Sequence, residues 1–134
     1  MDATPAQPPH VIAGFSVPRV MFQVLAALLP VLAVQIHLFG PRPLLLVAVA
    51  AIVALGCEAL ALHLRHRAVR PCLRDGSVLV TAALVALAVP PTLPLWQLAL
   101  GVAVAVLLAK HAYGGLGQNP FNPAMVGYAV LLVS

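Results

Sequence analysis

Uncharged apolar runs, separated by short polar segments, make up most of this chain. Between Arg19 and Arg42 lie 22 residues without a charge, and a second apolar run from 44 to 64 holds Glu58 as its one acid. An α-helix rises about 1.5 Å per residue and the hydrocarbon core of a bilayer is about 30 Å thick, so about 20 residues cross it. These two runs therefore predict transmembrane helices over residues 20–40 and 44–64.

Three further apolar runs follow, over residues 77–90, 95–110 and 121–134. The first is short and meets Pro90 and Pro91, so we expect a half-length or tilted helix, or a full one that borrows loop residues. The last has 14 residues up to Ser134, too few for a complete span, and we expect a truncated fifth helix. The pattern predicts an all-α membrane protein of four to five transmembrane helices, with a cytoplasmic arm over 1–18 and a transmembrane domain over 19–134.

The composition excludes a water-soluble domain. Hydrophobic residues make up 63% of the chain and charged residues only 7%, against about 25% in soluble domains. The net charge of +4 does not indicate nucleic-acid binding, because the basic residues stand at the ends of apolar runs. With a cytoplasmic N-terminus, six of the seven Lys and Arg residues lie inside and only Arg42 lies outside. The positive-inside rule therefore favours that orientation.

The cysteines and histidines do not follow a metal-binding pattern. Cys57 lies in an apolar run and Cys72 in a basic loop, so neither a disulfide nor a metal site is predicted. The five histidines are scattered, and we expect each to mark a helix end or a loop: His10, His37, His63, His66 and His111.

The segment GGLGQNPFNPA, residues 114–124, interrupts the last two apolar runs. Asn122 followed by Pro123 is a good helix start, because the Asn side chain caps free N–H groups and Pro suits the first turn. One interpretation is a turn that caps the fifth helix. The other is an embedded ligand site, since a broken helix presents N–H donors inside the membrane. Residues 122–124 also spell the NPA of water channels, but those carry two such motifs in matched halves.

Glu58 and Thr81 are polar positions within apolar runs. Glu58 lies six residues, roughly 9 Å, from the cytoplasmic end of its predicted helix. An ionisable group at that depth is costly and indicates a site for a coupling cation or proton. The alternative is pairing with Arg65, two turns along the same face. Thr81 either bonds a ligand or donates to a carbonyl of its own helix.

Three stretches of the chain resemble a known family, the NqrB/RnfD family. PPHVIAGFSVPRVMFQVLAALLP, LRDGSVLVTAALVALAVPPTLPLW and AKHAYGGLGQNPFNPAMVGYAVLLVS are similar to the N-terminal part of RnfD, from the Rnf ion-translocating electron-transport complexes. NqrB, from the sodium-translocating NADH:quinone oxidoreductase, shares that fold. The resemblance covers nearly the whole chain after residue 8, and GGLGQNPFNPAM is its most specific part.

This resemblance implies a multi-span subunit of a complex in the bacterial inner membrane, with the other complex subunits and lipids as partners. Such a component, not catalytic by itself, couples electron flow to Na⁺ or H⁺ movement. The family carries FMN, and riboflavin is a further expectation. The attachment threonine lies beyond this chain's end, and VTAAL at 80–84 is not its motif.

The resemblance also favours an embedded site in the broken segment, formed by Gly115, Gly117, Asn119 and Asn122. Two alternatives stay open. One is a small-solute channel or transporter built on a similar half, and the other is an inactive truncated fragment.

Overall fold

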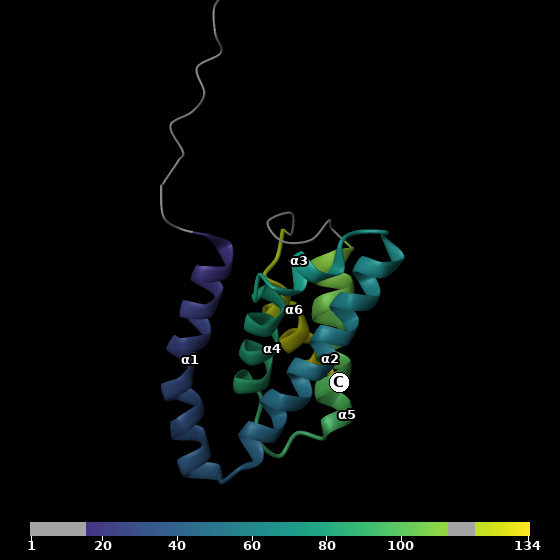
Figure 1. Ribbon diagram of the computed structural model, residues 1–134. Coiled ribbons are helices and arrows are strands. Elements are labelled where there is room, and N and C mark those ends of the chain that lie inside the picture. Colours follow the sequence, from purple (N-terminus) through teal and green to yellow (C-terminus); the bar gives the residue numbers. More distant parts are fainter. Residues whose placement is uncertain (1–15, 113–119) are drawn as a thin grey trace, which may run out of the picture.

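The computed structural model describes residues 16–112 and 120–134, and within these ranges the chain is helical without a strand (Figure 1). The elements are α1 (Val17–Phe39), α2 (Arg42–Leu64), α3 (Val69–Leu73), α4 (Ser77–Ala88), α5 (Leu95–Val104), the π-helix η1 (Ala105–His111) and α6 (Pro123–Val133). The helix α1 begins at Val17, with Pro18 in its first turn, so these two residues belong to the helix and not to the expected arm.

Within residues 16–112 and 120–134, two helices are long and apolar enough to cross a bilayer. They are α1 and α2, each of 23 residues, with mean hydropathies of 2.0 and 2.5. Three shorter apolar helices accompany them, over Ser77–Ala88, Leu95–His111 and Pro123–Val133. The chain is thus an all-α membrane protein. Of the alternatives for the run at 77–90, the structure has the short one, because α4 ends at Ala88 before Pro90 and Pro91.

The core lies between α2, α4 and α5, with α4 in the centre of the bundle. Small side chains such as Ala50, Ala54 and Ala82 allow the helices to approach closely, as in other membrane bundles. The helix α1 stands at the side of the bundle and has no buried residue (Figure 1). One polar contact ties it to α4, since Gln35 Nε2 donates to the carbonyl of Leu87 at 2.9 Å.

The helices α5 and α6 pack through glycines. A Cβ atom on Gly127 would lie 2.7 Å from the carbonyl oxygen of Gly101 and 2.9 Å from Cβ of Ala105. A Cβ on Gly101 would meet the side chain of Leu131 at 2.5 Å. Because real Cβ atoms do not approach so closely, these glycines set the spacing that places α6 beside α5 and η1.

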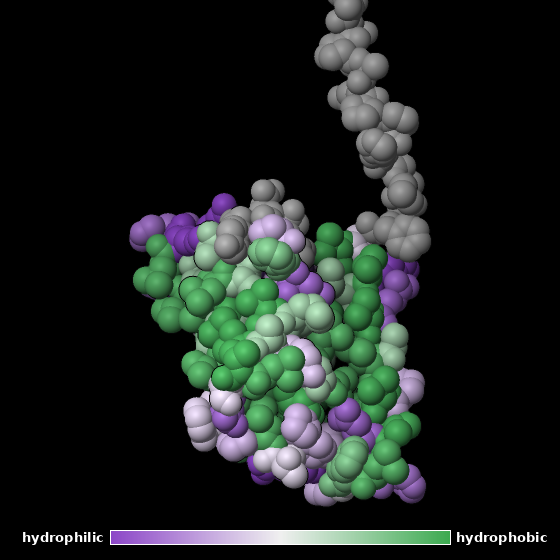
Figure 2. Space-filling model, turned by 180° about the vertical axis from the view of Figure 1, so that it is seen from behind, coloured by the Kyte–Doolittle hydropathy of each residue, from purple (hydrophilic) through white to green (hydrophobic). Residues whose placement is uncertain are grey.

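On the face that Figure 2 shows, apolar side chains cover a broad middle band, and polar residues gather toward the two ends. Arg42 lies at the end where the α1–α2 turn meets the α4–α5 loop. Its Nε donates to the carbonyl of Pro91 at 3.2 Å and its second terminal nitrogen to that of Leu93 at 3.3 Å. Arg42, the one basic residue expected outside, therefore closes the α4–α5 loop, whose prolines leave it few backbone N–H donors of its own.

Two elements differ from the predicted pattern. The sequence predicts a basic loop over residues 65–76, but Val69–Leu73 form the short helix α3 within it. It also predicts a single α-helix over 95–110, but the second half of that run is π-helical from Ala105 to His111. Such π segments are rare and are frequent at functional sites.

A buried ion-pair network as the candidate functional site

Glu58 is buried in the bundle, with 2% of its surface exposed. Its carboxylate faces η1, where Oε1 accepts a hydrogen bond from Lys110 Nζ at 2.8 Å. The second oxygen, Oε2, lies 2.7 Å from His111 Nε2. Lys110 and His111 are themselves only 3% and 6% exposed. Burial of one acid with two nitrogen partners avoids the large cost of an isolated charge in an apolar bundle.

The π-helical turn explains how two neighbouring residues reach one carboxylate. In an α-helix consecutive side chains point about 100° apart, since one turn takes 3.6 residues. The i→i+5 bonding of a π-helix widens the turn and reduces that angle. Lys110 and His111, the last two residues of η1, can therefore both face α2 at the level of Glu58.

Two more side chains extend the network toward the loop before α4. Lys110 Nζ also donates to Ser77 Oγ at 2.9 Å, and Ser77 Oγ donates to Asp75 Oδ1 at 2.7 Å. The same Asp75 oxygen accepts from the backbone N–H of Ser77 at 2.8 Å and holds the first turn of α4. Ser77 is 4% exposed, whereas Asp75 is partly exposed, so the network runs from the buried bundle to its edge.

Arg65 does not pair with Glu58, and that alternative prediction is wrong. It stands at the end of α2, and its guanidinium donates to the carbonyl oxygen of His111. A helix C-terminus carries partial negative charge, so a guanidinium there is favourable. Arg65 thus holds the end of η1 from the neighbouring helix α2, whereas Lys110 and His111 bind the carboxylate of Glu58.

The prediction that Thr81 bonds its own helix is confirmed. Its Oγ1 donates to the carbonyl oxygen of Ser77, four residues earlier, at 3.2 Å. Thr81 is buried and lines the same cavity as Ser77, but its hydroxyl proton goes to the backbone of α4 and not to the charged groups. It offers a natural comparison for Ser77.

A cavity of about 370 Å³ adjoins the network, and we call it the polar cavity after the four polar side chains in its otherwise apolar wall. It lies between α1, α4 and the start of α6, and Lys110, Ser77, Thr81 and Asn122 supply its polar side chains. Its volume falls within the range of small-molecule pockets, about 300–1,000 Å³. A larger groove of about 790 Å³ between η1 and α6 is lined only by apolar side chains, so polar chemistry rests with the smaller cavity.

Asn122 is the one predicted site residue of the broken segment that lies within the described residues. Its Oδ1 accepts from the backbone N–H of Ala124 at 3.0 Å, and Pro123 opens α6, so the predicted helix start is confirmed. Asn122 also lines the polar cavity, while its own residue surface is exposed. The other three predicted site residues, Gly115, Gly117 and Asn119, lie outside the described residues.

Histidines in the described part of the chain stand at helix ends or in a loop, as expected, but the sequence reasoning missed the role of His111. His37 and His63 lie in the last turns of α1 and α2, and His66 follows α2 with a positive φ of 52°. His111 ends η1 and yet is buried against Glu58. Among the described residues there is no group of three or more His, Cys, Asp or Glu that could hold a metal ion.

The sequence reasoning also missed Lys110 as a partner of Glu58, and Ser77 as the next partner of Lys110. The hydropathy pattern places Lys110 at the membrane edge, because it follows an apolar run of span length. The sequence held only a weak indication of this pair, namely a lysine at the end of one apolar run and an acid within another. Their separation of 52 residues leaves no local pattern that could establish the contact.

The fold and this network define a helical membrane protein that keeps ionisable side chains inside its bundle. The sequence profile of the NQR2, RnfD, RnfE family matches residues 4–134. The chain belongs to this family, and the resemblance seen in the sequence motifs is confirmed.

Three relatives are named as the D subunit of an ion-translocating oxidoreductase complex. The protein of Aeromonas salmonicida is 53% identical over 114 residues, which cover 85% of this chain and 33% of that protein. The Tolumonas auensis protein is 50% identical over 126 residues, covering 94% and 36%. The Escherichia fergusonii protein is 49% identical over 116 residues, covering 87% and 33%. The chain spans about a third of the length of these relatives.

Proposed function

We propose that this chain forms part of the membrane subunit of an ion-translocating electron-transport complex of the Rnf type, and that Glu58 couples ion movement to it. The observation that carries this proposal is the contact of one buried carboxylate with Lys110 and His111. The family and the names of the relatives supply the class of complex. They also favour this function over the small-solute channel.

The ion pair suits a coupling role because its charges balance. Glu58 and Lys110 together are neutral, so the bundle holds them at moderate cost. A cation or proton that reaches Glu58 disturbs this balance, and the ammonium of Lys110 loses its partner. Because an unpaired charge inside an apolar bundle is costly, the network has to rearrange or release a charge. This is the property that a coupling site requires.

The described residues do not fit a covalently attached flavin. Thr81 is buried, with its hydroxyl bonded to Ser77, and Thr92 lies exposed in the α4–α5 loop at the far end of the bundle. A non-covalent FMN or riboflavin fits better, in the polar cavity beside Lys110. There Lys110, Ser77 and Asn122 would offer hydrogen bonds to its polar ring edge, whereas the hydroxyl of Thr81 is already bonded within α4. When bound, such a flavin would supply electron transfer next to the ion pair.

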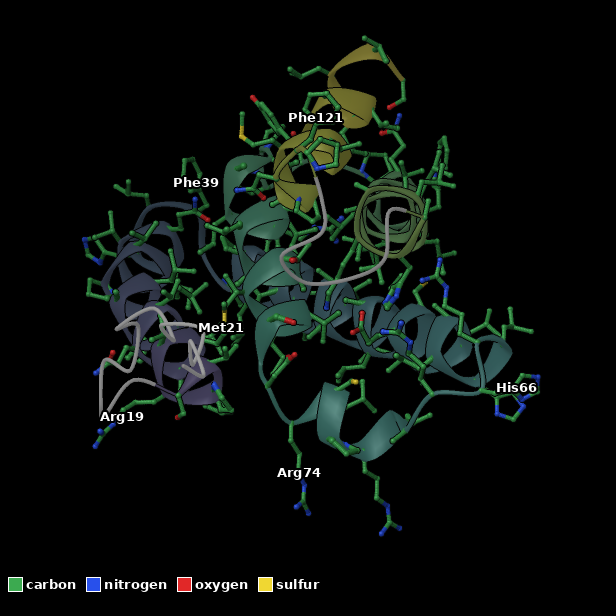
Figure 3. The ribbon with its side chains drawn as sticks, turned by 90° about the horizontal axis from the view of Figure 1, so that it is seen from above. Arg19, Met21, Phe39, His66, Arg74 and Phe121 are labelled. Carbon is green, nitrogen blue, oxygen red and sulfur yellow. The ribbon has the colours of Figure 1, made fainter. Side chains whose placement is uncertain are left out.

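We infer that the chain lies in a bacterial inner membrane with residue 16 on the cytoplasmic side. The α2–α4 loop and the start of α1 lie at one end of the bundle, and Arg42 lies at the other (Figure 1). Arg19, His66 and Arg74 point outward at the first end (Figure 3). This agrees with the positive-inside rule. The partners we propose are the other subunits of the complex and membrane lipids.

The test replaces Glu58 by glutamine in the full-length protein, within the assembled complex in membrane vesicles. We expect Glu58→Gln to lower the rate of ion uptake per electron transferred by roughly tenfold or more. Gln35→Leu is the matched control, because it also removes a polar side chain between two helices, one whose amide donates to the carbonyl of Leu87 and not to the ion pair. Unchanged ion uptake in Glu58→Gln would refute the coupling role.

A further inference from the structure

Both carboxylate oxygens of Glu58 are held by nitrogen atoms. Lys110 Nζ lies 2.8 Å from Oε1, and His111 Nε2 lies 2.7 Å from Oε2. Hard metal cations bind through several oxygen ligands. A sodium ion at Glu58 would have to displace both nitrogen partners, one of them a cation. A proton needs no such set of ligands, because it binds one atom at a time.

A continuous series of hydrogen bonds leads from Glu58 to the edge of the bundle. Lys110 Nζ bridges Glu58 Oε1 and Ser77 Oγ, and Ser77 Oγ donates to Asp75 Oδ1 at 2.7 Å. The hydrogen bonds from Lys110 to Ser77 and from Ser77 to Asp75 are both donated in the direction of Asp75. Glu58, Lys110 and Ser77 are 2%, 3% and 4% exposed, whereas Asp75 is partly exposed. Buried donors are thus aligned toward one accessible acid.

We propose that the ion handled by this site is a proton, and that it leaves Glu58 through Lys110 and Ser77 to Asp75; this rests on the proposed coupling role of Glu58. Lys110 gives a proton to Ser77 Oγ while Ser77 passes its own hydroxyl proton to Asp75. The neutral amine of Lys110 then takes the proton that Glu58 had acquired. The net change is one proton moved from Glu58 to Asp75, with no electron transferred.

The surrounding charges explain why the proton moves in this direction. Protonation of Glu58 removes the charge that holds the ammonium of Lys110 in the bundle, and an unpaired buried ammonium is costly. From η1, His111 also faces Glu58, and from α2 the guanidinium of Arg65 binds the carbonyl of His111. These positive or neutral groups disfavour a second positive charge near Lys110. Asp75, at the start of α4, is the acceptor on the opposite side.

The experiment uses the full-length protein in the purified complex, reconstituted in lipid vesicles that contain a pH-sensitive dye. Ser77→Ala interrupts the series and leaves every charge in place. Thr81→Val is the matched control, because it removes a buried hydroxyl one turn further along α4 that is not part of the series. We expect Ser77→Ala to lower the initial rate of proton movement at least about tenfold. Thr81→Val should stay within about twofold, and Ser77→Thr should restore the rate.

Asp75→Asn provides a second, independent interruption. Its amide oxygen still accepts from Ser77, so the start of α4 is kept, but the amide cannot take up the proton. The same loss is expected, and it keeps the proposal testable if Ser77→Ala fails to assemble. Proton movement at the unmodified rate in both variants would overturn the relay. So would vesicles that accumulate sodium and move no protons.

The relay and the coupling role fail in different ways. If Glu58→Gln stops ion movement but Ser77→Ala and Asp75→Asn do not, Glu58 remains the coupling residue and the relay is refuted. If Glu58→Gln moves protons at the normal rate, the coupling role is refuted and the relay with it. Loss in all three variants, with normal movement in Thr81→Val, supports both.

Discussion

Replacing Lys110 by methionine removes one partner of a buried ion pair and nearly keeps the size of the side chain. Nζ of Lys110 lies 2.8 Å from the carboxylate of Glu58, and the two side chains are 4% and 3% exposed. At an effective dielectric constant of about 20, that distance corresponds to a Coulomb attraction of about 6 kcal/mol. Part of it offsets the removal of both charges from water, so breaking such a pair typically costs about 3–5 kcal/mol.

We therefore expect Lys110→Met to lower the free energy of unfolding of the full-length protein by about 3–5 kcal/mol. The assay is unfolding by an ionic detergent in mixed micelles. The double variant Glu58→Gln/Lys110→Met leaves no uncompensated charge and should recover at least about 2 kcal/mol of that loss.

Arg70→Met is the control for loss of a positive charge at the same end of the molecule. Arg70 is exposed on α3, so its replacement should change the unfolding free energy by no more than about 0.5 kcal/mol. The reasoning is refuted if Lys110→Met is as stable as Arg70→Met. It is also refuted if the double variant shows the full sum of the two single losses.

Three further predictions concern the elements that hold the site. Gly127→Ala should destabilise the protein by about 1–3 kcal/mol in a thermal melt, because its Cβ would lie 2.7 Å from a backbone carbonyl of α5; Gly56→Ala, with nothing within 4 Å, should be neutral or slightly stabilising. Asn122→Ala should cost about 1 kcal/mol and speed amide exchange in the first turn of α6, whereas Asn122→Asp should not, because an aspartate still caps the helix. Arg42→Gln should raise hydrogen exchange in the segment 89–94, since two loop carbonyls lose their donor, and unchanged exchange there would contradict the stabilisation of this loop by Arg42.

Much of the secondary structure could be predicted, because hydropathy along a membrane chain reports directly on helix length. Glu58 also stood out, since a single acid in an apolar run is costly and therefore informative. The start of α6 was readable from Asn122 and Pro123 because capping is a local interaction between neighbouring residues.

The partners of Glu58 could not be predicted for two physical reasons. The helix α2 is apolar on nearly all sides, so no stripe of hydrophobic residues tells which face meets η1. The second reason is the π geometry of η1, which depends on backbone bonding and leaves no mark in the hydropathy pattern. Hydropathy alone therefore places Lys110 at the membrane edge, where most lysines at the end of an apolar run lie.

The 52-residue separation of Glu58 from Lys110 sets an order of events during synthesis. At about 5–20 residues per second, the ribosome completes η1 roughly 3 to 10 seconds after Glu58 has been made. During that interval α2 enters the translocon with an acid that has not yet met its lysine. Insertion of α2 must then tolerate a protonated or water-exposed glutamate, and delivery of η1 is the step that commits this helix to the bundle. Assembly of the nascent chain therefore depends on the same charge pair as the finished protein.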